Sequence, residues 1–344
     1  MRAMVECRTK VTALRWRGGL EILDQRRLPE VERWIDLPTA AAAAQAIRSL
    51  AVRGAPAIGL AAAYAFASEA RHNPELGHLR HVARRLAAAR PTAANLAAAI
   101  TAVLAAVEVV SPPRRFAAAL AAARALHARD AAACQAIAAN GAALFPGAKR
   151  RLLTHCNAGA LATGGVGTAL GIVRALHAAG RLERLFACEA RPVLQGARLT
   201  AWEAVQDGIP ITLLVDGAAA SLLALGMVDG IVVGAGRIAA DGAVANKVGT
   251  YGLAVAAARH GVPLVVAAPT TTFDLNCADG GAIPIEQRGS EEVRRQGRRW
   301  LAPPGVAVFN PAFDVTPADL VTAIVSERGV ARPVNAATVA EVAR

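Results

Sequence analysis

The stretch Leu153–Thr168, LTHCNAGALATGGVGT, constrains the fold of this chain more than any other. The apolar run Arg151–Thr154 predicts a buried strand that ends at Cys156, and the run Val166–Leu176 resumes at helical length. A strand, a loop of small residues and a helix start form an anion or sugar-phosphate site in α/β sheets, because backbone N–H groups and a helix dipole face a crevice. We therefore expect Cys156 to be a reachable thiol in a binding crevice. The alternative is a buried structural cysteine beside a tight turn.

The second half of the chain predicts alternating strands and helices after the sequence Phe145-Pro146-Gly147. The predicted strands are Arg151–Thr154, Leu185–Cys188, Ile211–Leu214, Gly230–Val233, Pro263–Ala267 and Gly305–Phe309. Because helical runs separate most of them, residues 146–344 are predicted to form a Rossmann-like domain with a doubly wound parallel sheet. Ligand sites then belong at the carboxyl ends of its strands.

The first half of the chain predicts a different arrangement. Residues 8–35 alternate and turn, which predicts a small antiparallel sheet, and the pattern from Thr39 to about Asn140 is helical. Residues 1–145 are therefore predicted to be an N-terminal domain of helices with a small antiparallel sheet. A hydrophobic share of 54% in 344 residues is enough to fill the cores of both domains.

Net charge raises the possibility of a nucleic-acid partner, since the chain carries a formal +12 at pH 7. The basic residues are nearly all arginines, with lysines only at Lys10, Lys149 and Lys247. They form no block of five like charges and no basic stretch interleaved with aromatic residues. We therefore predict no nucleic-acid partner and interpret the charge as an arginine-rich surface that favours phosphorylated substrates.

Five cysteines without a CxxC pair indicate neither a disulfide framework nor a thiolate metal site. His78 and His81 have ligand spacing on a helix but no third ligand, so we predict no bound metal. The N-terminus lacks the apolar core of a signal peptide. Of the two uncharged runs, Pro91–Val107 opens on Pro-Thr and is rich in alanine, and Asn157–Val173 is rich in glycine and broken by loop residues. These features predict a reduced cytoplasmic protein without a membrane span.

Two arginines precede predicted helix starts in the first half. Arg53 stands before Gly54 and Pro56, and the proline presets the backbone of a helix predicted to begin at Ala57. Arg90 opens the sequence RPTAAN in the same way. Taken alone, each arginine is interpreted as an exposed side chain at a helix end. Together they form a phosphate clamp if the fold brings them to one place.

Polar side chains follow several of the predicted strands in the second half. Gln195 can bind a hydroxyl through either end of its amide, and Lys247 beside Asn246 is suited to a phosphate or hydroxyl. The sequence Gly234–Ala239 fits the dinucleotide pattern G-x-G-x-x-A, but Asp241-Gly242 interrupts the helix that this pattern needs, and no acidic residue stands about 20 positions further on. We therefore predict no nicotinamide cofactor.

Seven ordered segments resemble the methylthioribose-1-phosphate isomerase family over nearly the whole chain. They are VRGAPAIG, ARPTAANL, CNAGALAT, RPVLQGARLTAWE, ANKVGTY, IPIEQR and NPAFDVTPADL. Ribose-1,5-bisphosphate isomerases and the regulatory subunits of the eukaryotic initiation-factor nucleotide exchanger share this fold but match less closely. The resemblance implies a cofactor-free, homodimeric aldose–ketose isomerase of a sugar phosphate in methionine salvage.

The resemblance also implies the role of each site residue. The implied substrate contacts are Arg53, Gly54, Ala55, Arg90, Gln195, Asn246 and Lys247. Cys156 takes the position of the catalytic cysteine. The family's proton-donating aspartate lies in a loop usually written GADRIAANG, and this chain reads GAGRIAADG, so that position is Gly236. A positioned acid or base contributes about 10²–10⁴ in rate, which glycine cannot supply. Asp241 stands five residues further along. Three functions therefore remain open. The chain is an impaired isomerase, an isomerase of another ribose 1-phosphate, or a catalytically silent relative that binds a sugar phosphate or has a regulatory role.

Overall fold

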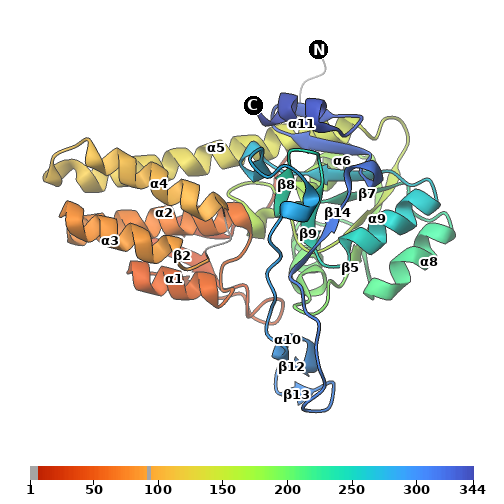
Figure 1. Ribbon diagram of the computed structural model, residues 1–344, viewed down its shortest axis with the longest axis horizontal. Coiled ribbons are helices and arrows are strands. Elements are labelled where there is room, and N and C mark those ends of the chain that lie inside the picture. The colour runs from red at the N-terminus through yellow and green to blue at the C-terminus, as the bar shows by residue number, and fades with distance from the viewer. Residues whose placement is uncertain (1–6, 91–93) are drawn as a thin grey trace.

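The computed structural model describes residues 7–90 and 94–344 (Figure 1). The N-terminal part holds a three-stranded antiparallel sheet and five helices. The strands are β1 (Leu14–Trp16), β2 (Leu20–Leu23) and β3 (Trp34–Asp36), and the helices are α1 (Ala40–Arg48), α2 (Ala55–His72), α3 (Leu76–Ala87), α4 (Ala94–Glu108) and α5 (Arg115–Ala143). This confirms the helical arrangement with a small antiparallel sheet. The first six residues, on which the signal-peptide prediction partly rests, and residues 91–93 of the ARPTAANL segment lie outside the described part.

Helix α2 begins at Ala55, two residues before the predicted start. Gly54 has a φ of +94°, and a Cβ atom there would lie 2.5 Å from the backbone of Ala162, so this position requires glycine. Pro56 stands in the first turn, where its missing N–H costs no helical hydrogen bond. The glycine thus serves a close contact with the loop around Ala162.

The C-terminal part is built on a seven-stranded sheet with the order β16-β15-β10-β7-β4-β5-β6. Its strands are β4 (Arg150–Thr154), β5 (Leu182–Cys188), β6 (Ile211–Leu214), β7 (Gly230–Val233), β10 (Leu264–Ala267), β15 (Ala323–Ser326) and β16 (Gly329–Ala331). All neighbours pair in parallel except β15 and β16. The chain runs outward from β4 to β6 and then, from β7, outward on the other side. This confirms the doubly wound, Rossmann-like sheet, and its topological switch point lies between β4 and β7.

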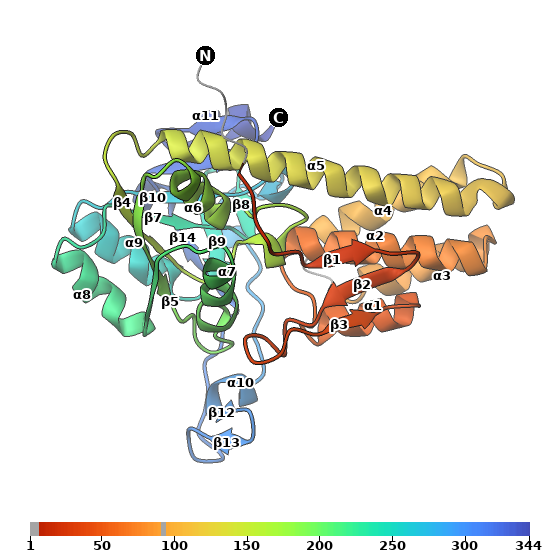
Figure 2. The same cartoon turned by 180° about the vertical axis from the view of Figure 1, so that it is seen from behind.

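Alternate residues of the buried strands point to opposite faces of this sheet. Leu152 packs into a cluster with α5 and α6 (Ala169–Ala178), whereas Leu153 packs into a cluster on the other face. The helices of that second face are α8 (Ala219–Ala224), α9 (Thr250–Arg259) and α11 (Ala336–Ala343). Figure 2 shows α5 and α6 in front of the sheet and α8 and α9 at its side. Both faces are thus covered, as a parallel sheet requires.

The predicted strand Gly305–Phe309 is wrong. These residues form no strand, and the Phe309 side chain is 83% exposed. They belong to a segment, residues 287–311, that projects from the body and is called the arm below (Figure 1). The arm carries α10 (Glu291–Arg294), β12 (Arg295–Gln296) and β13 (Arg299–Trp300). The sixth parallel strand is β15, which the sequence analysis missed.

A second sheet that the sequence did not predict lies beside the large one. It has the order β11-β8-β9-β14 and consists of β11 (Phe273–Asp274), β8 (Arg237–Ala239), β9 (Val244–Lys247) and β14 (Phe313–Thr316). Its strands are short and carry polar residues, so the periodicity that marks a buried strand is weak. This sheet presents Asn246 and Lys247.

Helix α5 joins the two parts. Its residues Ala119 and Ala123 pack into the core of the N-terminal helices, and Ile137 packs into the core under the large sheet. It ends at Ala143, close to the predicted division between residues 1–145 and 146–344, which stays a prediction. Within the described residues, no helix has both the length and the apolar character needed to cross a bilayer.

Candidate active site

A cavity of about 180 Å³ opens at the switch point of the large sheet. It lies against residues that follow β4 and β7, the start of α2, the strand β9 and the base of the arm. Its lining includes every substrate-contact and catalytic position implied by the resemblance, namely Arg53, Gly54, Ala55, Arg90, Cys156, Gln195, Gly236, Asn246 and Lys247. The fold therefore brings together residues that are up to 194 positions apart (53 to 247). Their roles stay predictions.

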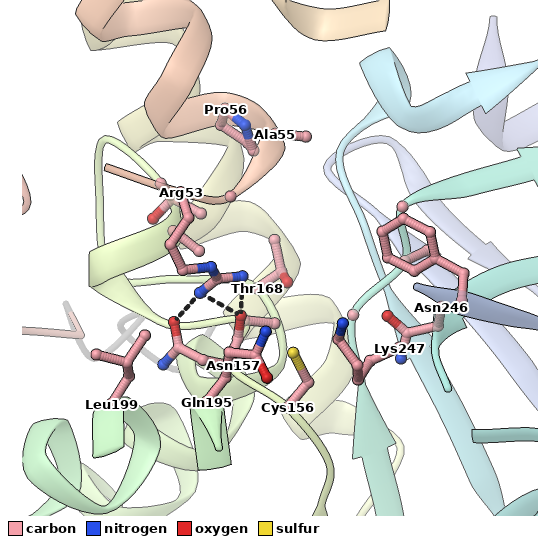
Figure 3. Close-up of a pocket in the computed structure, with 18 of the residues that line it drawn as sticks. Arg53, Ala55, Pro56, Cys156, Asn157, Thr168, Gln195, Leu199, Asn246 and Lys247 are labelled. Atoms are coloured by element: carbon pink, nitrogen blue, oxygen red, sulfur yellow. Dashed lines mark hydrogen bonds between the residues drawn. The ribbon is translucent and has the colours of Figure 1, made fainter. Parts of the chain in front are cut away.

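Cys156 directs its sulfur into this cavity (Figure 3). The residue is 9% exposed, and its φ of +66° places a non-glycine residue in the left-handed region. Thr200 Oγ1 donates to the Cys156 carbonyl at 2.6 Å, which helps to hold this backbone conformation. Strained residues of this kind concentrate at functional sites.

Arg53 reaches the cavity from the N-terminal part and is held by the residue next to the cysteine. Its Nη1 donates to Asn157 Oδ1 at 2.6 Å, and both Nη1 and Nη2 donate to the Asn157 carbonyl, at 3.1 and 3.0 Å (Figure 3). Burial lowers the pKa of Arg53, while Cys156 acts to raise it and Arg90 to lower it further. Both guanidinium groups line the cavity, so an anion there would meet two positive charges.

Further cations line the cavity beyond the predicted ones. Arg288, at the base of the arm, pairs with Glu286 at 3.0 Å, and the same carboxylate lies 3.6 Å from Arg90. Arg198 Nη2 donates to the Gln25 carbonyl at 2.6 Å. Arg53, Arg90, Arg198, Lys247 and Arg288 thus surround the cavity with positive charge. Such a lining favours a phosphorylated ligand.

Lys247 is the one lysine in this group. Its Nζ donates to the Ala312 carbonyl at 3.0 Å and lies 5.4 Å from the centre of the Phe313 ring. Burial lowers its pKa, Cys156 acts to raise it, and Arg53 lowers it further. An anion in the cavity would therefore favour the charged form of this amine.

Gln195 carries a hydrogen-bonding atom without a protein partner. Its Oε1 is buried in the described structure and accepts no hydrogen bond. Since an unpaired buried acceptor costs free energy, a ligand hydroxyl that donates to it would be stabilised. Asn246, by contrast, already donates from Nδ2 to Thr250 Oγ1 at 3.0 Å. Its carbonyl oxygen is the end left for a ligand.

Gly236 lines the cavity in a backbone conformation that any residue can adopt. Its φ lies outside the left-handed region, and an added Cβ would lie 3.4 Å from both the Ala245 carbonyl oxygen and the Phe313 ring. The residues after it form β8 and not a helix, so the dinucleotide-binding context is absent there. A side chain at position 236 therefore has room beside the cavity.

Asp241 lies outside the cavity and is held in a turn. Its Oδ1 accepts the Ala243 N–H at 2.9 Å, and its Oδ2 accepts the Gly280 N–H at 3.3 Å, so it is tied into a turn. It does not line the cavity, and no aspartate or glutamate is found among the described residues that do. An acid or base must lie within hydrogen-bond reach of the proton that it transfers. Asp241 does not reach the cavity in which that proton would lie.

Several backbone N–H groups of the small-residue loop after β4, residues 155–168, donate to protein groups and not into the cavity. The N–H groups of Ala160 and Leu161 donate to the Glu203 carboxylate at 2.8 and 3.1 Å. The N–H of Gly164 donates to Asp130, and that of Thr168 donates to a carbonyl of the same loop. The expectation that these amides face the crevice is therefore wrong for them. The positive charge of the cavity comes from side chains.

The lining residues that sequence reasoning missed include His155, Asn157, Arg198 and Arg288. Each stands next to or within a segment that carried the family resemblance, and that proximity is the signal that could have found them. Their contacts depend on partners far away in the sequence. Local patterns do not reveal such partners.

One group of possible metal ligands occurs among the described residues. His155, Cys188 and Asp216 each bring one ligand atom to within 4.8 Å of the others. His155 Nε2 already bonds the Val248 carbonyl at 2.9 Å, and Asp216 accepts the Ala190 N–H at 2.8 Å. Protein hydrogen bonds therefore account for much of this arrangement.

The thiols differ in environment, which gives a test of the site. We expect iodoacetamide at neutral pH to alkylate Cys156 first, because burial raises the pKa of Cys7 to about 11 and the pKa values of Cys134 and Cys188 to about 12. Those three are neutral thiols at that pH. The measurement is peptide mapping of alkylated protein over time, with and without inorganic phosphate.

Cys277 is the matched internal control for this labelling. It is 9% exposed, like Cys156, but lies outside the cavity, where its Sγ contacts the Asp279 carbonyl at 3.4 Å. Accessibility alone would give both residues the same rate. Equal labelling of the two, unaffected by phosphate, would count against a reactive cysteine site.

The sheet in the Rossmann order, with a cysteine and five cations at its switch point, defines a Rossmann-like α/β protein with a cationic small-molecule cavity. The chain belongs to the Initiation factor 2 subunit family, which it matches over residues 51–333.

Two relatives match the chain over nearly their whole length and share one name. The methylthioribose-1-phosphate isomerase of Anaeromyxobacter sp. (strain K) is 56% identical over 327 residues, which is 95% of each chain. The protein of the same name from Thermosynechococcus vestitus is 50% identical over 333 residues, 94% of each chain.

Solved structures show the same fold. The 5-methylthioribose 1-phosphate isomerase of Pyrococcus horikoshii OT3 superposes with a TM-score of 0.92 at 38% identity, covering 97% of this chain and 96% of that one. The translation initiation factor eIF-2B, subunit delta, from A. fulgidus superposes with a TM-score of 0.86 at 41% identity, covering 96% and 99%. The fold is therefore shared by proteins with an enzyme's name and proteins with a translation factor's name.

Proposed function

We propose that this chain is an aldose–ketose isomerase that converts 5-methylthioribose 1-phosphate to 5-methylthioribulose 1-phosphate, a step of methionine salvage. Relatives at 50–56% identity carry the name of that enzyme. The observation that carries the proposal is the cavity itself, in which the sulfur of Cys156 faces a lining of arginines and a buried lysine. Such a lining suits a sugar that carries a phosphate.

The chemistry of the substrate defines what the residues must do. Because the anomeric oxygen is phosphorylated, the ring cannot open as a free hemiacetal does. One proton must enter at the ring oxygen as the bond from that oxygen to C1 breaks. Hydrogen moves from C2 to C1, and one proton leaves the C2 hydroxyl as the ketone forms. Proton gain and loss balance, so the site needs groups that manage both protons.

The described residues that line the cavity supply groups for binding the sugar phosphate but no carboxyl for proton transfer. Arg53, Arg90 and Lys247 supply positive charge for the phosphate, and Gln195 Oε1 is a free acceptor for a sugar hydroxyl. We propose that Cys156 acts at C1 and C2 of a sugar held by these groups. Position 236, where the family places its proton-donating aspartate, holds glycine. We therefore propose that substrate binds well and turns over slowly.

A second candidate function follows from the lack of a carboxylate among the described lining residues. A relative that keeps the binding cavity but lacks the acid could bind a sugar phosphate without converting it, as a sensor or regulatory subunit does. Calorimetric binding of the substrate without any ketose product would favour this function over the isomerase.

Turnover of 5-methylthioribose 1-phosphate tests the proposal, with ketose formation followed by NMR. We expect measurable conversion that falls by at least about 10² in Cys156→Ser, the lower end of the range for a lost acid–base group. Cys277→Ser, which changes an equally exposed cysteine outside the cavity, is expected to leave turnover unchanged. Ribose 1-phosphate and ribose 1,5-bisphosphate, run in parallel, identify the preferred sugar. Absence of ketose from all three substrates would refute the isomerase.

We further propose that the protein is a cytoplasmic homodimer without a nucleic-acid partner. Strand β6 forms one edge of the large sheet. Its Leu213 side chain is 48% exposed, and Val215, directly after the strand, is 62% exposed. A second copy that covers this edge would remove apolar surface from water.

A further inference from the structure

We propose that Glu203, which lies behind the cavity and does not line it, is a positioning residue for anion binding. It acts through Asn157 on the guanidinium of Arg53 and thereby sets the direction in which Arg53 presents its charge. The proposal deepens the proposed function, and its consequence for turnover rests on that function. Its consequence for anion binding does not.

The surroundings of Glu203 require a carboxylate. The residue lies in α7 (Ala201–Gln206) and has no exposed surface. Its Oε1 accepts from Asn157 Nδ2 at 2.9 Å and the Leu161 N–H at 3.1 Å, and its Oε2 accepts from the Ala160 N–H at 2.8 Å and Arg174 Nη2 at 2.8 Å. Four donors converge on two oxygens. A carboxylate satisfies all of them, whereas an amide would turn its own N–H groups toward one pair.

The positive charge of Arg174 balances this carboxylate. Arg174 is 3% exposed and also contacts Asp207, 2.6 Å from its Nη2. Burial acts to lower the pKa of Arg174, but the carboxylates of Glu203 and Asp207 outweigh it and raise that pKa. A paired, fully hydrogen-bonded ion can therefore remain in the interior next to the site.

Asn157 transmits this arrangement to Arg53. Because Asn157 Nδ2 faces the carboxylate of Glu203, its Oδ1 must face the other way, where it accepts from Arg53 Nη1 at 2.6 Å. The Asn157 carbonyl accepts from both Nη atoms of Arg53. The side chain and the main chain of Asn157 therefore fix the plane of the Arg53 guanidinium. That plane sets the direction of the remaining N–H groups of Arg53.

The small loop residues fit this role. A Cβ atom at Gly159 would lie 2.3 Å from Glu203 Oε2, so the loop can close around the carboxylate only with glycine there. The end of this hydrogen-bond chain is a cation that lines the cavity, and its start is a buried ion pair. A contact that served stability alone would not need to end at the site.

The test compares two reagents of nearly equal size at Cys156. Iodoacetate is an anion and iodoacetamide is neutral, so the ratio of their alkylation rates measures the positive charge presented to the sulfur. A general loosening of the loop changes both rates and cancels in the ratio. Arg53→Ala defines the ratio without the arginine. The control is Asp229→Asn, which removes the partner of Arg151 in a partly exposed ion pair outside the cavity lining.

We expect Glu203→Gln to lower the iodoacetate-to-iodoacetamide ratio by about tenfold, the scale of one lost charge-assisted contact, toward the value of Arg53→Ala. If Glu203 acted only through its negative charge, its removal would make the cavity more positive, and the ratio would rise. A ratio that is unchanged or higher in the folded variant overturns the proposal. The control is expected to keep the original ratio.

A second variant decides the matter if Glu203→Gln does not fold. Asn157→Ala removes the side-chain link between Glu203 and Arg53 but leaves Glu203 paired with Arg174 and the main-chain carbonyl at position 157 bonded to Arg53, and we expect the ratio to fall in the same direction. An unchanged ratio in Asn157→Ala overturns the proposal. If the protein turns over the sugar phosphate, KM should rise by a similar factor in Glu203→Gln, with a smaller change in kcat. A lowered ratio in a protein with no turnover supports the positioning role and refutes only the isomerase.

Discussion

Gly236→Asp is expected to raise kcat on 5-methylthioribose 1-phosphate by about 10²–10⁴ while KM changes little. The new carboxyl would stand in a cavity whose described lining contains no other acid. Phosphate and hydroxyl contacts act alike in the ground and transition states, so they set KM, whereas a positioned proton donor acts on the barrier. The backbone at position 236 accepts a side chain without left-handed strain, and the nearest atoms to its Cβ lie 3.4 Å away.

Gly236→Asn is the matched control for this substitution. It has the same shape as the aspartate and occupies the same space beside Phe313, but it has no titratable proton. We expect it to bind substrate like the glycine form and to show no gain in kcat. An equal gain in both variants, or a glycine form that is already as fast as the aspartate form, would show that position 236 is not the site of the missing acid.

Arg174→Met is expected to lower the free energy of unfolding by about 3–5 kcal/mol, the cost of leaving a buried charge without its partner. Arg174 and Glu203 are 3% and 0% exposed, and Arg174 also holds Asp207 and the Val166 carbonyl. Methionine keeps much of the length and none of the charge. Chemical denaturation followed by circular dichroism measures the loss.

Arg151→Met is the control for this loss. It removes a similar ion pair, with Asp229 at 2.8 Å, but the two side chains are 31% and 24% exposed. Pairs that remain in contact with water contribute about 0–1 kcal/mol. Equal destabilisation by both substitutions would show that the buried network contributes no more than a surface pair.

The strands that the sequence predicted well are short, continuous apolar runs between turns. Ile211–Leu214 and Gly230–Val233 were predicted with their observed bounds, since continuous apolar runs between turns leave little choice. Gly305–Phe309 has a similar composition but lies on the arm, where no neighbouring strand of the large sheet is available to it. Composition reports the propensity for a strand, and only the tertiary fold supplies the partner.

Some residues of the candidate site could be predicted from local sequence, and others could not. Cys156, Arg53 and Lys247 could be singled out because each stands in a local motif at a predicted helix start or strand end. The bond from Arg53 to Asn157 spans 104 residues, and the role of Glu203 depends on a loop that closes around it. No local pattern encodes such contacts, since they exist only after the two halves have packed together.

Helix α5 has a mechanical consequence for the cavity. Its 29 residues form a rod about 44 Å long, and one end is embedded in each hydrophobic core. Arg53 belongs to the N-terminal part, and Cys156 follows a strand of the large sheet. Helix α5 connects these two parts, and so do the hydrogen bonds between Arg53 and Asn157. Widening the gap between Arg53 and Cys156 would require the helix to bend or to pull residues out of a core. The spacing of the two groups is thus held by the stiffness of a helix.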